Sequence, residues 1–234
     1  MGKTMMLTFY YDVGRPNTYL AWKALSATPG VELDMRPVLI GGLFKSANNQ
    51  PPWQSFGGVP LKMRYVMAEI ARFADMYGLG EFAMNPHFPV NTLLAMRAAT
   101  AARMDGHHEA CVPALFAAMW EDAVDVSEPA ELARVLDTAG LSGGALVARA
   151  GEPEVKAALK AATAEAHGRG VFGLPTWFTP EGEMYFGKDC CWMMHPGAER
   201  VVARRAVARR AVAGPYPGLR ESWWVEGSSC RTRR

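Results

Sequence analysis

The sequence contains no long hydrophobic run. Half of its 234 residues are hydrophobic, yet no apolar stretch approaches the roughly 18–20 residues that a membrane-spanning helix needs. The N-terminal stretch also lacks the apolar core and the small-residue cleavage site of a secretory signal peptide. We therefore expect a globular, cytoplasmic protein without membrane contact, large enough to form one domain or a domain with an insertion.

Cysteine is also scarce. The chain has four cysteines, Cys111, Cys190, Cys191 and Cys230, which fits the reduced thiols of a cytoplasmic protein. Two of them are adjacent, and adjacent cysteines have poor geometry for a structural disulfide. Potential metal ligands gather between His107 and Cys111, but their spacing matches no zinc-binding pattern. We predict no metal site and interpret this stretch as the polar start of a helix.

The hydrophobic pattern predicts a β-α-β unit, a long helical block and a closing α-β-β-α unit. The expected elements are a strand at 6–12, a helix at 17–28, a strand at 31–40, a long irregular loop at 43–60, helices through about 60–168, strands at 176–179 and 184–187, and a last helix from about 189. The outer parts together predict an α/β fold, a four-stranded thioredoxin-like unit with a large all-helical insertion.

This order also predicts the domain boundaries. Residues 1–43 and 169–205 would form the thioredoxin-like domain, and residues 44–168 the helical insertion. Residues 206–234 would form an irregular basic tail, for which disorder is one expectation.

The stretch Val171-Phe-Gly-Leu-Pro-Thr-Trp-Phe178 is typical of the proline loop of a thioredoxin fold. A cis bond between Leu174 and Pro175 would turn the backbone N–H and C=O of Leu174 outward. There they could pair with a peptide-like thiol ligand, such as glutathione or a protein thiol. The alternative interpretation is an ordinary turn before a strand.

The start of the first helix has no cysteine. Thioredoxin-like proteins place their reactive group there, because free N–H groups and the helix dipole stabilise a thiolate. A redox member would carry Cys-x-x-Cys, whereas this chain has Gly14-Arg-Pro-Asn17. Disulfide exchange by the usual route is excluded, so a thiol that acts here must come from a ligand.

Several longer motifs occur in one order along residues 6–189. They are Phe9-Tyr-Tyr-Asp-Val-x-x-Pro16 with Tyr19–Ala21, Arg36–Lys45 with Asn49-x-Pro-Pro52, Asn85–Thr92 with Met96-Arg97, and Val171-Phe-Gly-x-Pro-Thr176 with Gly187-x-Asp189. Together they resemble the 2-hydroxychromene-2-carboxylate isomerase family, close kin of kappa-class glutathione transferases with a DsbA-like fold. The resemblance implies bound glutathione and a homodimer.

The resemblance also assigns the thiol site, with one departure. In the family, a serine before the helix proline holds the glutathione thiolate, and here that position is Arg15. Arginine is long and cationic. It could lower a thiol pKa by its charge, or it could fill the thiol pocket and abolish activity. Thr18, one turn further on, offers a hydroxyl that could substitute for the serine.

The remaining glutathione contacts implied by the resemblance lie near the C-terminal strands. Leu174 and Pro175 would hold the cysteinyl part of the ligand. The stretch Phe186, Gly187, Lys188 and Asp189 would hold its γ-glutamyl end. Asp189 could bind the α-ammonium group or act as a helix N-cap, and it could do both.

Substrate contacts are implied at Lys45, Asn49 and His87. Lys45 would supply the cation that a carboxylate substrate requires, although a loop lysine is otherwise often only solvated. His87 would lie at the mouth of the same cleft, or would pack its ring in a loop. Trp120 and Tyr65 are predicted to pack between helices, and Met63, Met67 and Met76 to fill the core.

The C-terminal part has few acidic residues. Residues 196–234 contain nine arginines against three glutamates, and a basic tail can indicate nucleic-acid binding. However, the family would continue after Asp189 with Arg-Leu and acidic residues. Cys190-Cys-Trp-Met-Met-His195 back-translates to DNA in which the frame two bases on reads Leu-Leu-Asp-Asp-Ala. Our hypothesis is a shifted frame from about 190, which replaces a γ-glutamyl ligand by Cys190 and implies no nucleic-acid partner.

The function implied by the resemblance is a glutathione-dependent isomerase. It would convert 2-hydroxychromene-2-carboxylate, a small aromatic carboxylate, to trans-o-hydroxybenzylidenepyruvate in the degradation of aromatic compounds. Two alternatives stay open. One is a kappa-class-like glutathione transferase that uses the same site, and the other is a glutathione-binding protein that has lost catalysis because of Arg15.

Overall fold

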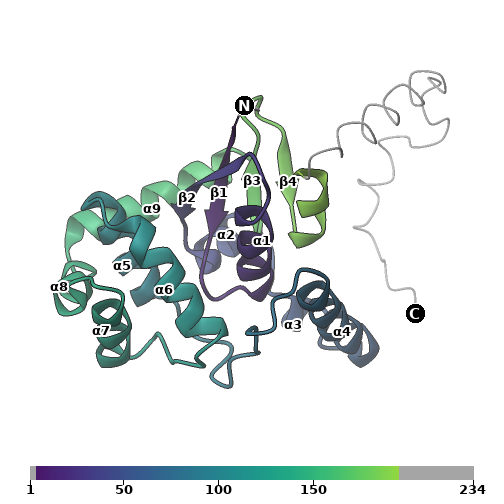
Figure 1. Ribbon diagram of the computed structural model, residues 1–234, viewed down its shortest axis with the longest axis horizontal. Coiled ribbons are helices and arrows are strands. Elements are labelled where there is room, and N and C mark those ends of the chain that lie inside the picture. The colour runs from purple at the N-terminus through teal and green to yellow at the C-terminus, as the bar shows by residue number, and fades with distance from the viewer. Residues whose placement is uncertain (1–3, 195–234) are drawn as a thin grey trace, which may run out of the picture. The chain divides into compact units, whose positions relative to one another are not determined.

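Four strands form one mixed sheet in the computed structural model, which describes residues 4–194 (Figure 1). They are β1 (Met5–Tyr11), β2 (Val31–Pro37), β3 (Thr176–Phe178) and β4 (Met184–Phe186). Their order in the sheet is β2-β1-β3-β4. β1 and β2 are parallel, whereas β3 is antiparallel to β1 and to β4. The predicted thioredoxin-like order of strands is confirmed.

The two faces of the sheet belong to two hydrophobic clusters, because successive side chains of a strand point to opposite faces. Phe9 and Tyr11 of β1 pack into a cluster with α1 (Pro16–Ser26). Tyr10 packs on the other side, against Leu43 of α2 (Ile40–Ser46) and Ala166 of α9 (Pro153–Gly168). In Figure 1, α1 lies in front of the sheet and α2 behind it.

The remaining helices lie between β2 and β3 in the sequence, apart from the last. They are α3 (Pro52–Ser55), α4 (Pro60–Met76), α5 (Leu93–Met104), α6 (His108–Trp120), α7 (Pro129–Thr138), α8 (Gly143–Arg149) and the 3₁₀ helix η1 (Lys188–Met194). Buried residues of β1, α1, α5 and α6 belong to one hydrophobic cluster. The helical segment therefore shares its core with the sheet.

The predicted irregular loop at 43–60 is wrong. β2 ends at Pro37, and α2 and α3 occupy much of the expected loop. The pair Gly41-Gly42 has low helix propensity, but a Cβ at Gly42 would lie 3.0 Å from Cγ2 of Thr163 on α9. Glycine lets α2 pack closely against α9, and this tertiary contact outweighs the local propensity.

Helix α4 is more exposed than its sequence predicted. Trp120 is buried as expected, but Tyr65 is 63% exposed and Met76 70%. The interpretation of Tyr65, Met67 and Met76 as packing residues is therefore wrong. Within residues 4–194, no helix is long and apolar enough to cross a membrane. The predictions for the tail after 194 lie outside the described residues.

Candidate functional site

A buried carboxylate, Asp12, ties together the segments that surround the start of α1. Its Oδ1 accepts a hydrogen bond from Gly14 N at 2.9 Å, and its Oδ2 accepts one from Ile40 N, the first residue of α2, at 3.0 Å. Thr92, before α5, also bonds to it. Burial raises the pKa of Asp12, while these hydrogen bonds oppose the rise. Asp12 thus fixes three loops around one point.

Gly14 is required at this junction. A Cβ on Gly14 would lie 2.6 Å from Cγ2 of Thr92, closer than any real contact allows. The glycine lets the chain turn from β1 into α1 directly beside the start of α5.

Arg15 is the N-cap residue of α1, and its side chain turns toward aromatic rings of α2 and α3. The guanidinium carbon lies 5.6 Å from the ring centroid of Phe44 and 5.3 Å from that of Trp53. Both distances fit cation–π contacts. Burial lowers the pKa of Arg15, and the charge of Asp12 offsets part of this effect. The guanidinium is therefore held by the aromatic rings.

The first turn of α1 contains polar atoms without partners. Oγ1 of Thr18 and Oδ1 of Asn17 are buried and have no hydrogen-bond partner among the described residues. Thr18 itself is completely buried. Since buried polar groups are normally hydrogen-bonded, these atoms indicate a place where a ligand can supply the missing partner. The positive end of the helix dipole favours an anionic ligand there.

The Leu174–Pro175 bond is cis, as predicted. The loop is anchored by the hydrogen bond from Gly187 N to Pro175 O at 3.0 Å and by that from Thr176 Oγ1 to Gly173 O at 2.8 Å. Within residues 4–194, the N–H and C=O of Leu174 have no hydrogen-bond partner. The loop thus offers one donor and one acceptor from the same residue, the pairing that an extended peptide-like ligand can use.

Asn49 lies at this loop and Lys45 does not. Nδ2 of Asn49 donates to Phe172 O at 3.0 Å. Lys45 instead lines a cavity between α2, α5 and α9, with Arg97, Lys156 and Lys160. The structure therefore separates two residues that the sequence placed together, and their predicted substrate contacts stay predictions.

Lys188 and Asp189 pair with each other after β4. Nζ of Lys188 contacts Asp189 Oδ1 at 2.9 Å and also pairs with Glu69 of α4, while the lysine is 1% exposed. Partial burial acts to raise the pKa of Asp189, but the hydrogen bonds from Lys188 and Glu69 and the charge of Lys188 together outweigh it, and the pKa lies below its usual range. Lys188 attaches η1 to α4. The predicted γ-glutamyl contacts at Phe186–Asp189 stay predictions, and Asp189 is the exposed carboxylate among them.

His87 is half-exposed, in the loop between α4 and α5. Its Nδ1 lies 3.8 Å from Oδ2 of Asp125. The next residue, Phe88, contacts Trp53 with 5.4 Å between ring centroids and Trp120 with 6.0 Å. His87 is therefore adjacent in sequence to an aromatic wall made of Phe44, Trp53, Phe88 and Trp120. Its predicted place at the mouth of a cleft stays a prediction.

Sequence reasoning missed Asp12, Phe44 and Trp53 as parts of this site. Asp12 and Phe44 lay inside motifs that were used to identify the family, but no local pattern showed which side chains face Arg15. Their role depends on contacts between segments far apart in the sequence. A polar residue directly after an otherwise apolar strand was the one available indication for Asp12.

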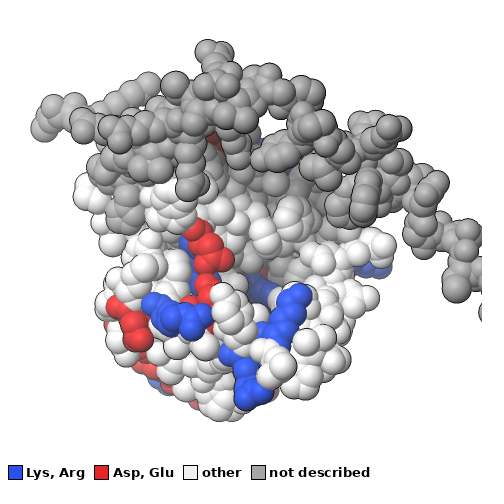
Figure 2. All heavy atoms as spheres, turned by 90° about the vertical axis from the view of Figure 1, so that its right-hand side faces the viewer, with Lys and Arg blue, Asp and Glu red and all other residues white. Residues whose placement is uncertain are grey.

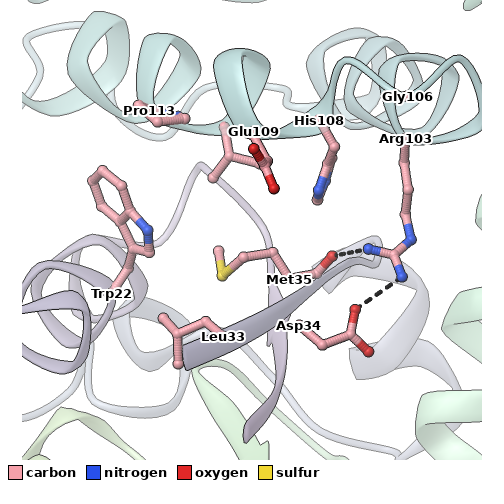
Figure 3. Close-up of a pocket in the computed structure, with 10 residues that line it drawn as sticks. Trp22, Leu33, Asp34, Met35, Arg103, Gly106, His108, Glu109 and Pro113 are labelled. Atoms are coloured by element: carbon pink, nitrogen blue, oxygen red, sulfur yellow. Dashed lines mark hydrogen bonds and ion pairs between the residues drawn. The ribbon is translucent and has the colours of Figure 1, made fainter. Parts of the chain in front are cut away.

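A separate cavity of about 520 Å³ lies between β2, α5 and α6 (Figure 3). Arg103 donates to Met35 O at 2.6 Å and pairs with Asp34 at 2.9 Å. His108 and Glu109 of α6 project toward it, and Nε2 of His108 lies 2.9 Å from the hydroxyl of Tyr11. Burial lowers the pKa of His108 to about 4, so the ring is neutral near pH 7.

Comparison with known proteins agrees with the fold and with the family resemblance. The chain is 28% identical to rat glutathione S-transferase kappa 1 over 199 residues, covering 79% of this chain and 86% of that protein. It is 29% identical to 2-hydroxychromene-2-carboxylate isomerase of Sphingobium xenophagum over 191 residues, covering 80% and 94%. A solved 2-hydroxychromene-2-carboxylate isomerase structure superposes with a TM-score of 0.72 at 22% identity, covering 90% of this chain and all of that one.

The family model that matches is described as a DSBA-like thioredoxin domain, and it matches residues 6–195. It covers all four strands and the helical segment between β2 and β3. The chain therefore belongs to the DSBA-like thioredoxin domain family.

Proposed function

We propose that this protein is a glutathione-dependent isomerase that converts 2-hydroxychromene-2-carboxylate to trans-o-hydroxybenzylidenepyruvate. The observation that carries the proposal is that the chain has two unsatisfied sites, the buried Oγ1 of Thr18 and the free peptide groups of Leu174. The first suits a thiol, and the second suits the cysteinyl backbone of a peptide. The relatives named above, an isomerase and a kappa-class glutathione transferase, support the same ligand.

The residues present fit glutathione at three points. Leu174 supplies a backbone donor and acceptor for the cysteinyl unit. Thr18 supplies a hydroxyl at the positive end of α1, where a thiolate is stabilised. Asp189, with a carboxylate that keeps its charge, is a partner for the α-ammonium group.

Bound glutathione would supply a thiolate that adds to the conjugated substrate, opens its ring, permits rotation about a transient single bond and leaves again. The chain's own part is to lower the thiol pKa and to align the reactants. Thr18 would donate a hydrogen bond to the sulfur. Arg15 would add positive charge close to the same helix end, which also favours the anionic sulfur.

In this proposal Arg15 leaves the thiol position open. Its guanidinium lies against Phe44 and Trp53, beside an aromatic wall that suits a planar aromatic substrate. A guanidinium at the edge of such a wall can pair with the carboxylate of the substrate. The proposed place of the reaction is the degradation of aromatic hydrocarbons in the cytoplasm.

A second candidate is glutathione transfer to electrophiles at the same site. The similarity to the rat transferase favours it. It shares the glutathione contacts and differs in the second substrate, so turnover of an aryl halide without turnover of the chromene carboxylate would select it.

Calorimetric titration of glutathione tests the proposal, alongside a spectrophotometric isomerase assay. We expect binding to the natural protein, and a loss of roughly 10–100-fold in kcat for Thr18→Val because a hydrogen bond to a charged sulfur is removed. Arg15→Ser should bind glutathione within about threefold of the natural protein but should raise KM for the carboxylate substrate. Thr138→Val, an exposed threonine on α7, serves as the control and should change neither quantity.

Two outcomes would overturn the proposal. If glutathione binds only to Arg15→Ser, then Arg15 blocks the thiol pocket in the natural protein. If neither protein binds it, the family relation describes the fold without the ligand.

We also propose that the protein is a homodimer that pairs through α4. The residues Leu61, Tyr65, Ala68, Arg72 and Met76 are all exposed, and their spacing of three and four places them in one stripe of the helix. Figure 2 shows the side of the molecule on which α4 lies in Figure 1, and much of its described surface between the charged side chains is uncharged. Apart from Arg72 this stripe is apolar, and exposed apolar patches mark interfaces.

A further inference from the structure

A cavity that lies behind the sheet combines an apolar lining with basic side chains. It has a volume of about 420 Å³ and lies between α2, the start of α5 and α9. Its apolar lining includes Leu39, Leu93 and Leu159. Small-molecule pockets have volumes of roughly 300–1,000 Å³ and a mainly apolar lining, so the cavity has the size and the walls of a ligand site.

The charged residues around this cavity are all basic. Lys45 of α2, Arg97 of α5, and Lys156 and Lys160 of α9 line it, and no aspartate or glutamate does. None of the four forms an ion pair with another described residue.

Lys156 and Lys160 show this excess of positive charge most clearly. They are one turn apart on α9, a spacing at which like charges destabilise a helix by a few tenths of a kcal/mol. Glu152 lies one turn before Lys156, but its carboxylate pairs with Arg149. The positive charge at the cavity is therefore not neutralised within the described part of the chain.

The cavity lies on the face of α2 opposite to the Arg15 site. Gly42 and Ser46 line the cavity, whereas the ring of Phe44 faces Arg15. At about 100° per residue, Phe44 points roughly 200° away from Gly42 around the helix axis. A ligand in the cavity would therefore be separated from the thiol site by the helix itself.

We propose that this cavity is a second binding site, for an amphipathic organic anion with an apolar body and a single acidic group. The apolar body would lie against the leucines, and the acidic group would lie among the four cations. Binding removes apolar surface from water and relieves the repulsion between like charges. The inference is independent of the proposed glutathione chemistry, because neither Thr18 nor Leu174 lines the cavity.

Two matched probes test the site. 8-Anilinonaphthalene-1-sulfonate has an aromatic body and one sulfonate, and N-phenyl-1-naphthylamine has the same body without the charge. We expect the full-length protein to bind the sulfonate at least about tenfold more tightly, and expect Lys156→Glu/Lys160→Glu to weaken its binding by about tenfold or more. Lys156→Arg/Lys160→Arg should retain affinity within about threefold because the charge is kept.

A control and a competitor exclude other binding places. Arg134→Glu/Thr138→Glu places two carboxylates at the same spacing on exposed positions of α7 and should leave sulfonate affinity within about twofold. S-hexylglutathione should not displace the sulfonate. The proposal is overturned if the α9 charge reversal leaves affinity unchanged while circular dichroism shows a folded protein, if the control weakens binding equally, or if S-hexylglutathione displaces the probe.

Discussion

At the scale of single residues, His108 shows how burial converts an ionisable group into a pH-dependent contribution to stability. Its ring is within hydrogen-bond distance of the buried Tyr11 hydroxyl, and burial lowers its pKa to about 4. In the unfolded chain the pKa is about 6.5. Between these values the unfolded state binds a proton that the folded state does not, so stability is complete above about pH 6.5 and falls as the pH is lowered toward 4.

The prediction is a loss of roughly 2–3 kcal/mol in the free energy of unfolding between pH 6.5 and 4 that depends on His108. Urea unfolding of the natural protein and of His108→Gln across this range measures it, and the variant should lose less stability on acidification. His107→Gln changes the exposed neighbour and should retain the natural pH dependence. Equal slopes for His108→Gln and the natural protein would contradict the assignment.

Residues that the sequence identified correctly carry a local pattern, and those that it missed do not. Pro175 lies in a recognisable octapeptide, and its bond is cis. Arg15 was named as a site residue because it stands where the family has serine, and its role stays a prediction. What the sequence left open was the direction of the Arg15 side chain, because this depends on Phe44 and Trp53, which are distant in the sequence and meet it only in the folded protein.

At the scale of elements, η1 and α4 are joined by one buried lysine. Lys188 is 1% exposed, whereas the side chains of its partners Glu69 and Asp189 are 27% and 72% exposed. When Lys188 is removed, the carboxylates of Glu69 and Asp189 can still be hydrated. When a carboxylate is removed, the ammonium group of Lys188 stays buried and cannot be hydrated. Removing one partner of a buried ion pair is costly mainly because it leaves the other charge buried.

This asymmetry predicts unequal costs for two substitutions. Glu69→Leu should destabilise the protein by about 2–4 kcal/mol, since Lys188 keeps only the exposed Asp189. Lys188→Met should cost less than about 1 kcal/mol, because methionine fills a similar volume and packs beside Phe73. Urea unfolding of both variants and of the double variant measures the difference. A Lys188→Met variant as unstable as Glu69→Leu would show that the lysine contributes more than charge balance.

The strands were predicted more reliably than the short helices for a physical reason. The aromatic run Phe9-Tyr10-Tyr11 of β1 favours a strand and is visible in the sequence, and all three residues are buried, on the two faces of the sheet. By contrast, α2 starts at a hydrogen bond from Ile40 N to Asp12 and packs Gly42 on α9. Both causes are long-range contacts, and neither appears in the local composition.

At the scale of the whole molecule, the exposed stripe of α4 is the surface through which we propose that the homodimer forms. Its inner side chains Ile70, Phe73 and Ala74 are buried, and its outer stripe starts with Leu61 and Tyr65, which are 67% and 63% exposed. A stripe that pairs with the same stripe of a second copy forms a two-fold interface in which each substitution acts twice. Each substitution on this stripe therefore changes the interface at two positions, one in each subunit.

Sedimentation equilibrium tests this arrangement. We expect the natural protein to sediment as a dimer, and Leu61→Glu/Tyr65→Glu to shift it to a monomer, because four carboxylates would then meet in an apolar interface and each would have to be desolvated or separated. Ala157→Glu/Ala161→Glu places the same charges on exposed positions of α9 and should leave the dimer intact. A natural protein that is monomeric at high concentration would contradict the proposed dimer. A dimer that survives the α4 substitutions would place the interface away from the apolar stripe of α4.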